Sequence, residues 1–365
     1  MTRKEFIKIC GIFGIGFPFQ ASLVSCNEDV NTPNLKVIII GAGAGGLSAG
    51  YFLQQQGIDF EILEASESYG GRMKIDTDFA DFPIPLGAEW LETSTDIFEQ
   101  IVNDNSVQVD VETISDAPDR KFVNYSWYNF FKEYIVPSIT DKISYQTIVQ
   151  SVDCSGDNVI ISTENQEYMA DKVIVSVPLK ILQDGDITFT PNLPQDKLEA
   201  INDTVIWQGF KAFFEFSTKL YGDNEFVFPI TPASDGQKIY YNAALGQNTD
   251  KHILGLFVVG KPALDYMSLS DEDLKNFILN ELDSISNNQA TPNYIKHITQ
   301  NWNNEPFIKS GYMTDYADWQ TVRELGRPVG NKVYFAGGAY TDGNDWVSVH
   351  AAAKSAKDAV DILNG

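Results

Sequence analysis

Hydrophobic and polar positions near residue 35 predict the start of a layered α/β fold. Residues 35–40 are a run of mostly β-branched apolar side chains without alternation, which is typical of a parallel strand buried on both faces. A helix is predicted over residues 47–56, with Gly57 as the glycine that ends it. A second strand is predicted at residues 60–63. This order of strand, helix and strand predicts a Rossmann-like domain.

A glycine-rich turn, residues 41–46, joins the first strand to the helix. Gly41 permits the tight turn, Gly43 lets the backbone approach a pyrophosphate, and Gly46 lets the helix pack closely on the strand. Amides at the start of the helix then meet the phosphates. Glu64 follows the second strand, where it would accept hydrogen bonds from the ribose of NAD or FAD. The predicted cofactor-binding residues of this unit are Gly41, Gly43, Ala44, Gly45, Gly46, Glu64 and Ala65.

Strand-like patterns dominate residues 190–309. Ser270 is predicted to cap a helix over residues 271–285, whose acidic first residues suit the helix dipole. Together these elements predict an α+β part with a mixed sheet and a covering helix. The strands are predicted at residues 211–216, 226–230, 238–243 and 253–259.

The net charge of -24 over 365 residues excludes nucleic acid as a partner, because no basic stripe is present to displace counterions from phosphates. Such a surface either attracts a cationic substrate or only keeps the protein soluble. His252 and His297 lie in strand-like stretches without metal-ligand spacing, so no metal site is predicted.

Residues 1–25 have the pattern of an export signal. Basic residues precede an apolar stretch over residues 9–19, which is too short and too interrupted to span a bilayer. The four residues ending at Cys26 resemble a bacterial lipobox, and the basic start fits either a twin-arginine or a general secretory signal. We therefore predict a lipoprotein, periplasmic or on the cell surface, anchored through Cys26 and a tether over residues 26–34. Only Cys154 then remains free, so no internal disulfide is possible.

Further along, segments occur in the order found in flavin-dependent amine oxidases of the monoamine, polyamine and L-amino-acid oxidase type. Residues 67–73 (ESYGGRM) resemble that family's second phosphate-contacting segment, which favours FAD over NAD. Five more segments resemble the family's flavin loop, adenine strand, proline turn, final strand and last helix start. They are residues 86–91, 147–152, 172–179, 333–338 and 346–352.

The resemblance implies further contacts with FAD. Gly338 stands where the family usually has a glutamate. Gly311 stands where members with covalent flavin have a cysteine, so FAD is expected to bind non-covalently. The cofactor-binding residues implied by the resemblance are Gly71, Arg72, Gly87, Ala88, Glu89, Trp90, Val149, Gly337, Gly338, Ser348 and Val349.

The resemblance also implies how the domains are divided. Residues 35–92, 141–189 and 310–365 would form the FAD-binding domain, interleaved with a smaller substrate domain from residues 93–140 and 190–309. The part of the substrate domain before residue 141 is much shorter than in the family. Five aromatic residues in it are expected either to line the pocket or to pack in the core: Trp127, Tyr128, Phe130, Phe131 and Tyr134.

The implied reaction is oxidation of a small-molecule amine by hydride transfer to flavin N5, with reoxidation by dioxygen or another acceptor. Lys211 matches the lysine that is bonded through water to N5, and Tyr312 matches an aromatic wall of the substrate site. The opposite wall has only Ser348, with Trp346 nearby, and His350 is expected to be structural. Two alternatives remain open: a desaturase-like flavoenzyme acting on an apolar substrate, or a surface FAD-binding protein without turnover.

Overall fold

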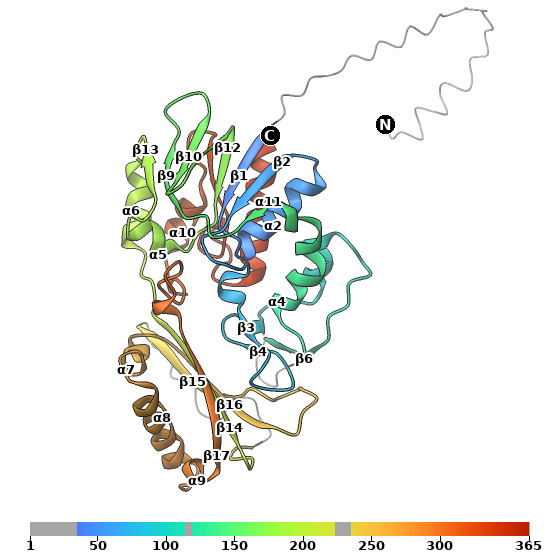
Figure 1. Cartoon of the computed structure of the whole chain (residues 1–365), viewed down its shortest axis with the longest axis vertical. Coiled ribbons are helices and arrows are strands. Elements are labelled where there is room, and N and C mark those ends of the chain that lie inside the picture. The colour runs from blue at the N-terminus through green and yellow to red at the C-terminus, as the bar shows by residue number, and fades with distance from the viewer. Residues whose placement is uncertain (1–34, 114–118, 223–234, 365) are drawn as a thin grey trace, which may run out of the picture. The chain divides into compact units, whose positions relative to one another are not determined.

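The computed structural model describes residues 35–113, 119–222 and 235–364 (Figure 1). Residues from Leu35 onward form one compact unit. The predicted export signal, the tether and the strand at residues 226–230 lie outside the described residues. Among the described helices, none is long and apolar enough to cross a membrane.

A five-stranded parallel sheet lies at the centre of the fold. Its middle strand β1 (Lys36–Ile40) pairs with β12 (Lys172–Val175) on one side and with β2 (Asp59–Leu63) on the other. The outer strands are β18 (Val333–Phe335) beside β12 and β8 (Ile143–Ser144) beside β2. Val37 to Ile40 are buried, so the predicted parallel strand with two buried faces is confirmed.

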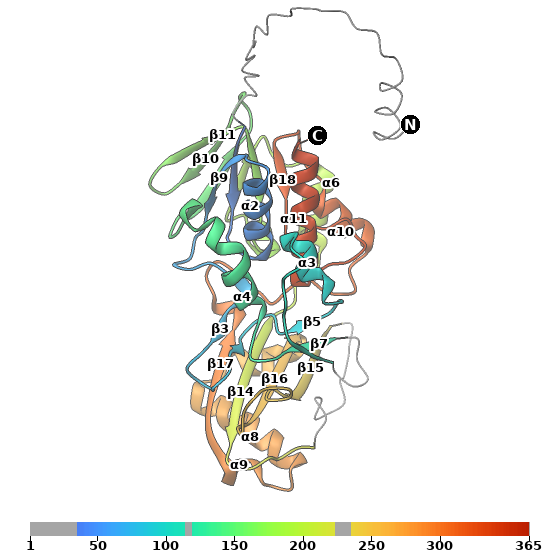
Figure 2. The ribbon, with the colours of Figure 1, turned by 90° about the vertical axis from the view of Figure 1, so that its right-hand side faces the viewer.

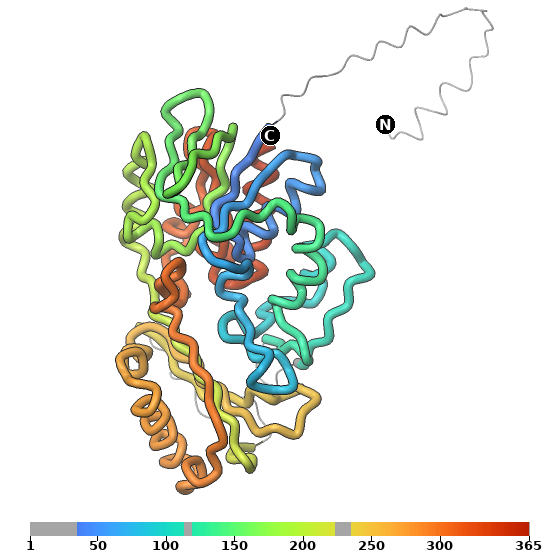
Figure 3. The backbone as a smooth tube through the Cα atoms, in the orientation of Figure 1, coloured from blue at the N-terminus to red at the C-terminus, as the bar shows by residue number. Residues whose placement is uncertain are grey.

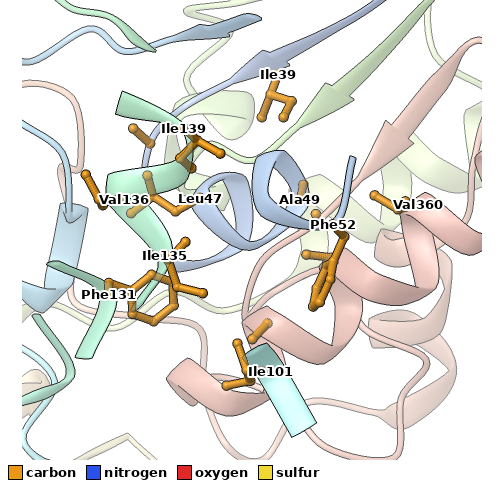
Figure 4. Packing of buried hydrophobic residues seen from close by; sticks show 14 of the residues in the cluster. Ile39, Leu47, Ala49, Phe52, Ile101, Phe131, Ile135, Val136, Ile139 and Val360 are labelled. Carbon is orange, nitrogen blue, oxygen red and sulfur yellow. The ribbon is translucent and has the colours of Figure 1, made fainter. Parts of the chain in front are cut away.

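Two helices pack together on one face of this sheet. Helix α2 (Ala44–Gln55) begins earlier than the predicted residue 47, inside the glycine turn, and Gly57 follows its end with φ of 70°. It packs against α11 (Val349–Asn364), as Figure 2 shows. In Figure 4, Phe52 of α2 reaches toward Val360 of α11. These contacts bury the apolar sides of both helices against the sheet.

The short segment before β8 contains several short helices as well as strands. It contains α3 (Asp96–Val102), α4 (Trp127–Phe130), η2 (Phe131–Ile135), η3 (Val136–Ser138) and η4 (Thr140–Lys142). Its aromatic rings are in the core: Phe98 lies against Trp127 and Phe130, and Tyr128 stacks on Tyr69. Of the two expectations for these aromatic residues, core packing is therefore confirmed.

A second sheet flanks the first. Strands β9 (Val149–Asp153), β10 (Val159–Thr163) and β11 (Glu167–Ala170) are antiparallel, and β13 (Thr188–Thr190) joins β9 in parallel. This is a mixed sheet. Apolar side chains of this sheet belong to the same hydrophobic cluster as those of three helices: α5 (Leu179–Gln183), α6 (Gln195–Asp203) and α10 (Trp319–Gly326).

The third sheet has the order β15-β16-β14-β17 and is antiparallel throughout. Its strands are β14 (Gly209–Phe216), β15 (Gly236–Asn242), β16 (His252–Gly260) and β17 (Tyr294–Asn301). The α/β fold class is confirmed, but the mixed sheet expected in this segment is the β9–β13 sheet instead. Strands β15 and β16 are joined by a short connection, which favours antiparallel pairing. Helix α8 (Asp271–Ile285) joins β16 to β17, and these two strands run parallel to each other on either side of β14.

One helix covers the third sheet. Helix α8 (Asp271–Ile285) has the predicted bounds, and the Ser270 side chain accepts a hydrogen bond from the Asp273 amide. Leu274, Ile278 and Leu282 point into the core under the sheet, where α8 lies along one face (Figure 1). Shorter helical turns flank it: η5 (Lys261–Ala263), α7 (Leu264–Met267), α9 (Ala290–Asn293) and η6 (Trp302–Asn304).

Short strands and two crossing segments connect the parallel and antiparallel sheets. The segments near Trp207 and Tyr312 run side by side, joined by backbone hydrogen bonds of 2.8 and 2.9 Å (Figure 3). Gly209 and Gly311 touch at this crossing, because a Cβ at Gly209 would lie 2.6 Å from the Gly311 Cα. The helical turn η1 (Gly71–Met73) precedes the first short strand. The short strands are β3 (Ile75–Asp76) with β4 (Ile84–Pro85), and β5 (Trp90–Leu91) with β7 (Arg120–Phe122) and β6 (Val111–Thr113).

Candidate active site

A cavity of about 730 Å³ opens at the carboxyl ends of the parallel strands and extends to β14, β15 and β16 of the antiparallel sheet. The carboxyl edge of a parallel sheet is where ligands bind in this class of fold, and the volume suits a bound cofactor. Every predicted cofactor or catalytic residue except Gly46 lines it: Gly41, Gly43, Ala44, Gly45, Glu64, Ala65, Gly71, Arg72, Gly87, Ala88, Glu89, Trp90, Val149, Lys211, Tyr312, Gly337, Gly338, Ser348 and Val349.

The glycine turn has the geometry of a phosphate cradle. A Cβ at Gly46 would lie 1.9 Å from the Gly41 carbonyl oxygen, so Gly46 provides close packing of helix and strand and does not reach the cavity. A Cβ at Gly43 would meet no atom within 4 Å and would project into the cavity. Helix α2 starts at this point without a side-chain cap or an acidic residue in its first turn. Its amides are thus available to an anion.

Glu64 connects two loops at the edge of the cavity. Its Oε2 accepts a hydrogen bond of 2.6 Å from the Ala42 amide, and its Oε1 accepts one of 2.8 Å from the Ser66 amide. Each carboxylate oxygen has a further lone pair, so the group can still accept from a ribose. The ribose contact stays a prediction, and the structure adds that Glu64 fixes the glycine turn.

Arg72 faces the cavity without a carboxylate partner among the described residues. Its Nη1 donates to the Gly311 carbonyl oxygen at 2.5 Å, and burial lowers the pKa of the guanidinium. A partly buried cation without an anion is unfavourable unless a ligand supplies the negative charge. The pyrophosphate of FAD fits this position, since arginine pairs well with phosphate oxygens.

The last predicted contact segment is strained. Val347 has φ of 66°, a value that β-branched residues rarely adopt, and its amide donates to the Gly338 carbonyl at 2.8 Å. Such conformations cost about 1–3 kcal/mol and concentrate at ligand sites. A Cβ at Gly338 would lie 3.3 Å from the Val347 Cα. The family's glutamate therefore lacks ordinary room at Gly338 in this chain.

Lys211 lies in the wall of the cavity, fully surrounded by acceptors. Its Nζ donates to Glu89 Oε2 at 2.6 Å, to the Pro85 carbonyl at 2.7 Å and to the Gly87 carbonyl at 3.2 Å. Burial lowers the pKa of Lys211 below its ordinary value, although Glu89 opposes the shift. The loop predicted to pass beside the flavin is thus held to β14 by this one ammonium group.

A second buried lysine shares Glu89. Lys121 on β7 has its Nζ 3.3 Å from Glu89 Oε1 and donates to the Ala243 carbonyl at 2.8 Å, while the Tyr241 hydroxyl donates to Glu89 Oε2. Burial alone raises the pKa of Glu89, but Lys211, Lys121 and Tyr241 outweigh burial and hold that pKa below its usual range. Sequence reasoning missed Lys121, because nothing in its neighbourhood marks it as buried.

The aromatic residues expected near the substrate also reach the cavity. Tyr312 lines it and packs edge-on against the Trp207 ring, with centroids 5.9 Å apart. Burial raises the pKa of Tyr312 far above its usual value, so the phenol stays neutral. Trp346 and Ser348 line the same cavity. An aromatic group and a small polar group are therefore both present, as the resemblance implied.

Acidic residues form part of the lining that the sequence did not reveal. Leu91 pairs with Arg120 between β5 and β7, which places Glu92 and Asp119 next to each other at the end of the ladder. Burial, with Asp119 and Asp345 nearby, raises the pKa of Glu92 to about 7. Asp315 and Asp345 line the cavity too. A cavity with this charge suits a cationic ligand.

The comparison with known families agrees with this geometry. A sequence model described as flavin containing amine oxidoreductase matches residues 131–364, which is more than half of the chain. The chain belongs to this family. A second model, described as an NAD(P)-binding Rossmann-like domain, matches residues 39–104 around the glycine turn.

Some relatives align with most of this flavin amine oxidoreductase, and others align with only part of it. Polyamine oxidase 2 of Arabidopsis thaliana is 24% identical over 441 positions, which span 91% of this chain and 89% of the relative. Lysine-specific histone demethylase 1B of Mus musculus is 26% identical, over 54% of this chain and 25% of the relative. The alignment with polyamine oxidase 2 is longer than this chain, so that relative carries segments which this chain lacks.

Solved structures show the same fold. A structure of putrescine oxidase bound to putrescine superposes with a TM-score of 0.70 at 15% identity, covering 91% of this chain and all of the other. With the family match, the chain is an FAD-dependent amine oxidoreductase. Among the described residues, no group of three or more histidine, cysteine or acidic side chains is placed to hold a metal ion.

Proposed function

We propose that this flavin amine oxidoreductase oxidises a primary or secondary amine that carries at least one positive charge when it binds. The observation that carries the proposal is the composition of one cavity. Residues that fit FAD line one part of it, and four carboxylates, Glu92, Asp119, Asp315 and Asp345, line the same space. Relatives named polyamine oxidase and putrescine oxidase support amines with two or more nitrogens as the first substrates to test.

The protein's own residues would bind, orient and shield the substrate. FAD supplies the hydride acceptor, N5, and returns the electrons to dioxygen or another acceptor. The apolar side chains Phe210, Ile239 and Phe257 also line the cavity and would exclude water from the reacting carbon. Tyr312 offers a neutral ring against the substrate, and Lys211 a buried ammonium group in the wall.

The test is anaerobic flavin reduction by the purified, FAD-loaded protein. We expect putrescine or a longer polyamine to bleach the flavin absorbance, and peroxide to appear when air is readmitted. The matched control is a mono-N-acetylated diamine, which keeps the length of the substrate but has one charge fewer and should react more slowly. Bleaching only by apolar substrates would support the desaturase-like alternative, and no bleaching by amines, amino acids or polyamines would support a protein without turnover.

We also propose export and lipid anchoring through Cys26, which rests on the sequence of residues 1–26 alone. Membrane fractionation tests it with the full chain. The wild-type protein should sediment with membranes, and the Cys26→Ser variant should be released into the soluble fraction. A Cys26→Ser variant that still sediments would contradict the proposal.

A further inference from the structure

His350 lies between two carboxylates in the first turn of α11. Its Nε2 is 2.7 Å from Asp345 Oδ2, and its Nδ1 is 3.9 Å from Glu92 Oε2. The side chain of His350 is only 11% exposed, whereas that of Asp345 is 50% exposed in a loop with the exposed Asn344. Asp345, His350 and Glu92 thus form a row along the cavity wall, in which the imidazole is buried and the two carboxylates, 41% exposed for Glu92 and 50% for Asp345, reach solvent.

In the neutral imidazole, the contact with Asp345 indicates which ring nitrogen carries the proton. An ionised Asp345 can only accept, so the His350 Nε2 must carry the hydrogen that joins them. Nδ1 then has a free lone pair. It is a buried atom without a hydrogen-bond partner, and it is the ring nitrogen nearest Glu92. An unpaired buried acceptor is costly, and a protonated Glu92, with its Oε2 3.9 Å away, is the nearest group that could donate to it.

We propose that Glu92, His350 and Asp345 form a path that carries the proton released by an ammonium substrate out of the cavity. This inference rests on the proposed function, because amines bind at neutral pH as ammonium ions and only the neutral amine can lose a hydride. A proton must therefore leave the site in every turnover. Side chains that are positioned to accept and donate a proton can carry it away from the substrate.

The steps balance without any further reactant. The carboxylate of Glu92 takes one proton from the substrate ammonium, which leaves a neutral amine and a neutral carboxyl group. Glu92 passes this proton to Nδ1 of His350, and the imidazolium releases its Nε2 proton to Asp345 and from there to water. The ring then carries its proton on Nδ1, and a flip of the imidazole away from Glu92 lets this proton exchange with water, so that the ring returns to its Nε2–H form without giving a proton back to Glu92.

The groups that face the path favour transfer near neutral pH. Asp119, which directly precedes β7, and Asp345 both add negative charge near Glu92, and Tyr312 lies on the same side of the cavity. With a pKa of about 7, Glu92 can both take up and release a proton near neutral pH. Ser348, whose Oγ lies 3.2 Å from the His350 Nε2, is the remaining polar neighbour.

The experiment measures the limiting rate of flavin reduction by saturating putrescine between pH 6 and pH 10 in the FAD-loaded protein. In His350→Gln we expect the rate to fall at least tenfold at pH 6.5 and to approach the wild-type rate near pH 10, where free amine is abundant. Asp345→Asn should give the same pattern with a smaller loss. Its side chain is half exposed, so this variant is expected to fold normally.

The matched control is His252→Gln, on β16 and away from the cavity lining, which should keep the wild-type pH profile. A loss of rate in His350→Gln that is equal at all pH values would indicate a structural effect and would overturn the path. An unchanged profile would overturn it as well.

A measurement without substrate separates this inference from the proposed function. The chain has three histidines, so ¹⁵N-histidine labelling gives three imidazoles, and His350→Gln identifies the one of interest. We expect His350 to show the Nε2–H form at pH 8 and its titration to change in Glu92→Gln. The opposite tautomer would overturn the path even if amines are oxidised, whereas failure of every amine to reduce the flavin would overturn the proposed function.

Discussion

The Nζ of Lys211 and the carboxylate of Glu89 form an ion pair of 2.6 Å in which both side chains are almost fully buried. The pair joins strand β14 of the antiparallel sheet to the loop between β4 and β5. A lysine placed in this way cannot move without leaving a buried charge behind. The ion pair therefore fixes both the position and the charge of the Lys211 side chain in the cavity wall.

Replacing Lys211 tests its predicted role at the flavin. In Lys211→Met, we expect reoxidation by dioxygen to slow by roughly tenfold to hundredfold, because a preorganised charge beside the reacting atoms is lost. Stopped-flow absorbance of the reduced protein mixed with air-saturated buffer measures this rate. Lys296→Met, on β17 of the same sheet and half exposed, is the control and should behave as wild type. Undiminished turnover and reoxidation in Lys211→Met would exclude the assignment.

Glu89 should determine stability in acid. The variant Glu89→Gln leaves Lys121 and Lys211 as two buried cations without a carboxylate, so at pH 7 we expect a loss of about 3–5 kcal/mol in the free energy of unfolding. The pKa of Glu89 is lowered in the folded state, so its contribution is complete above the ordinary carboxyl pKa and is lost as pH falls through the folded value. Urea denaturation at several pH values should show the gap between the two proteins narrowing in acid.

Ionised Glu92 should destabilise the folded protein, whereas ionised Glu89 stabilises it. Its folded pKa is raised to about 7, so ionising it in the folded protein costs free energy as pH rises from the ordinary carboxyl value toward 7. We expect Glu92→Gln to raise the melting temperature at pH 8 and to leave it unchanged at pH 4. Differential scanning calorimetry measures both. Glu164→Gln, in an exposed turn, is the control, and a Glu92→Gln protein that gains nothing at pH 8 would contradict the raised pKa.

Two glycines of the same turn should respond differently to the same substitution. In Gly43→Ala the added methyl group meets no protein atom but enters the cavity, so the fold should persist while FAD affinity falls about a hundredfold. In Gly46→Ala the methyl group would lie 1.9 Å from the Gly41 carbonyl oxygen, so the apoprotein itself should be destabilised. FAD titration by fluorescence and thermal melting of the apoproteins distinguish the two. Equal FAD affinity in Gly43→Ala and wild type would place the phosphates elsewhere.

Local patterns were sufficient to predict the parallel sheet, its glycine turn and the helix over residues 271–285, because in each case hydrophobic period, glycines and capping residues agree. The start of α2 was predicted too late, since glycines are poor helix formers by propensity and were assigned to the turn. The mixed sheet was assigned to the wrong segment because strand direction depends on connections that a strand's own residues do not encode.

The residues of the candidate site could be predicted where they belong to a sequence motif. They could not be predicted where only the pairing of strands brings them to the cavity. Gly43, Arg72 and Lys211 belong to short segments with a recognisable order. Lys121 and Asp119 become relevant only because β7 pairs with β5, and that register is a property of the folded chain. A weak signal was present for Glu92, which directly follows the segment 86–91 that resembles the family's flavin loop. Its raised pKa depends on neighbours from distant parts of the chain.

The close contact between Gly209 and Gly311 affects how the amount of this protein in a cell depends on the supply of riboflavin. A side chain at position 311 would have its Cβ 3.0 Å from the Gln208 oxygen and from the Gly209 Cα, so a cysteine that could tether the flavin has little room there. A cofactor held only by reversible contacts is lost and regained by mass action, and its binding adds to folding stability in proportion to the logarithm of its concentration. Cells short of riboflavin should therefore accumulate less of this protein, in addition to leaving more of it inactive.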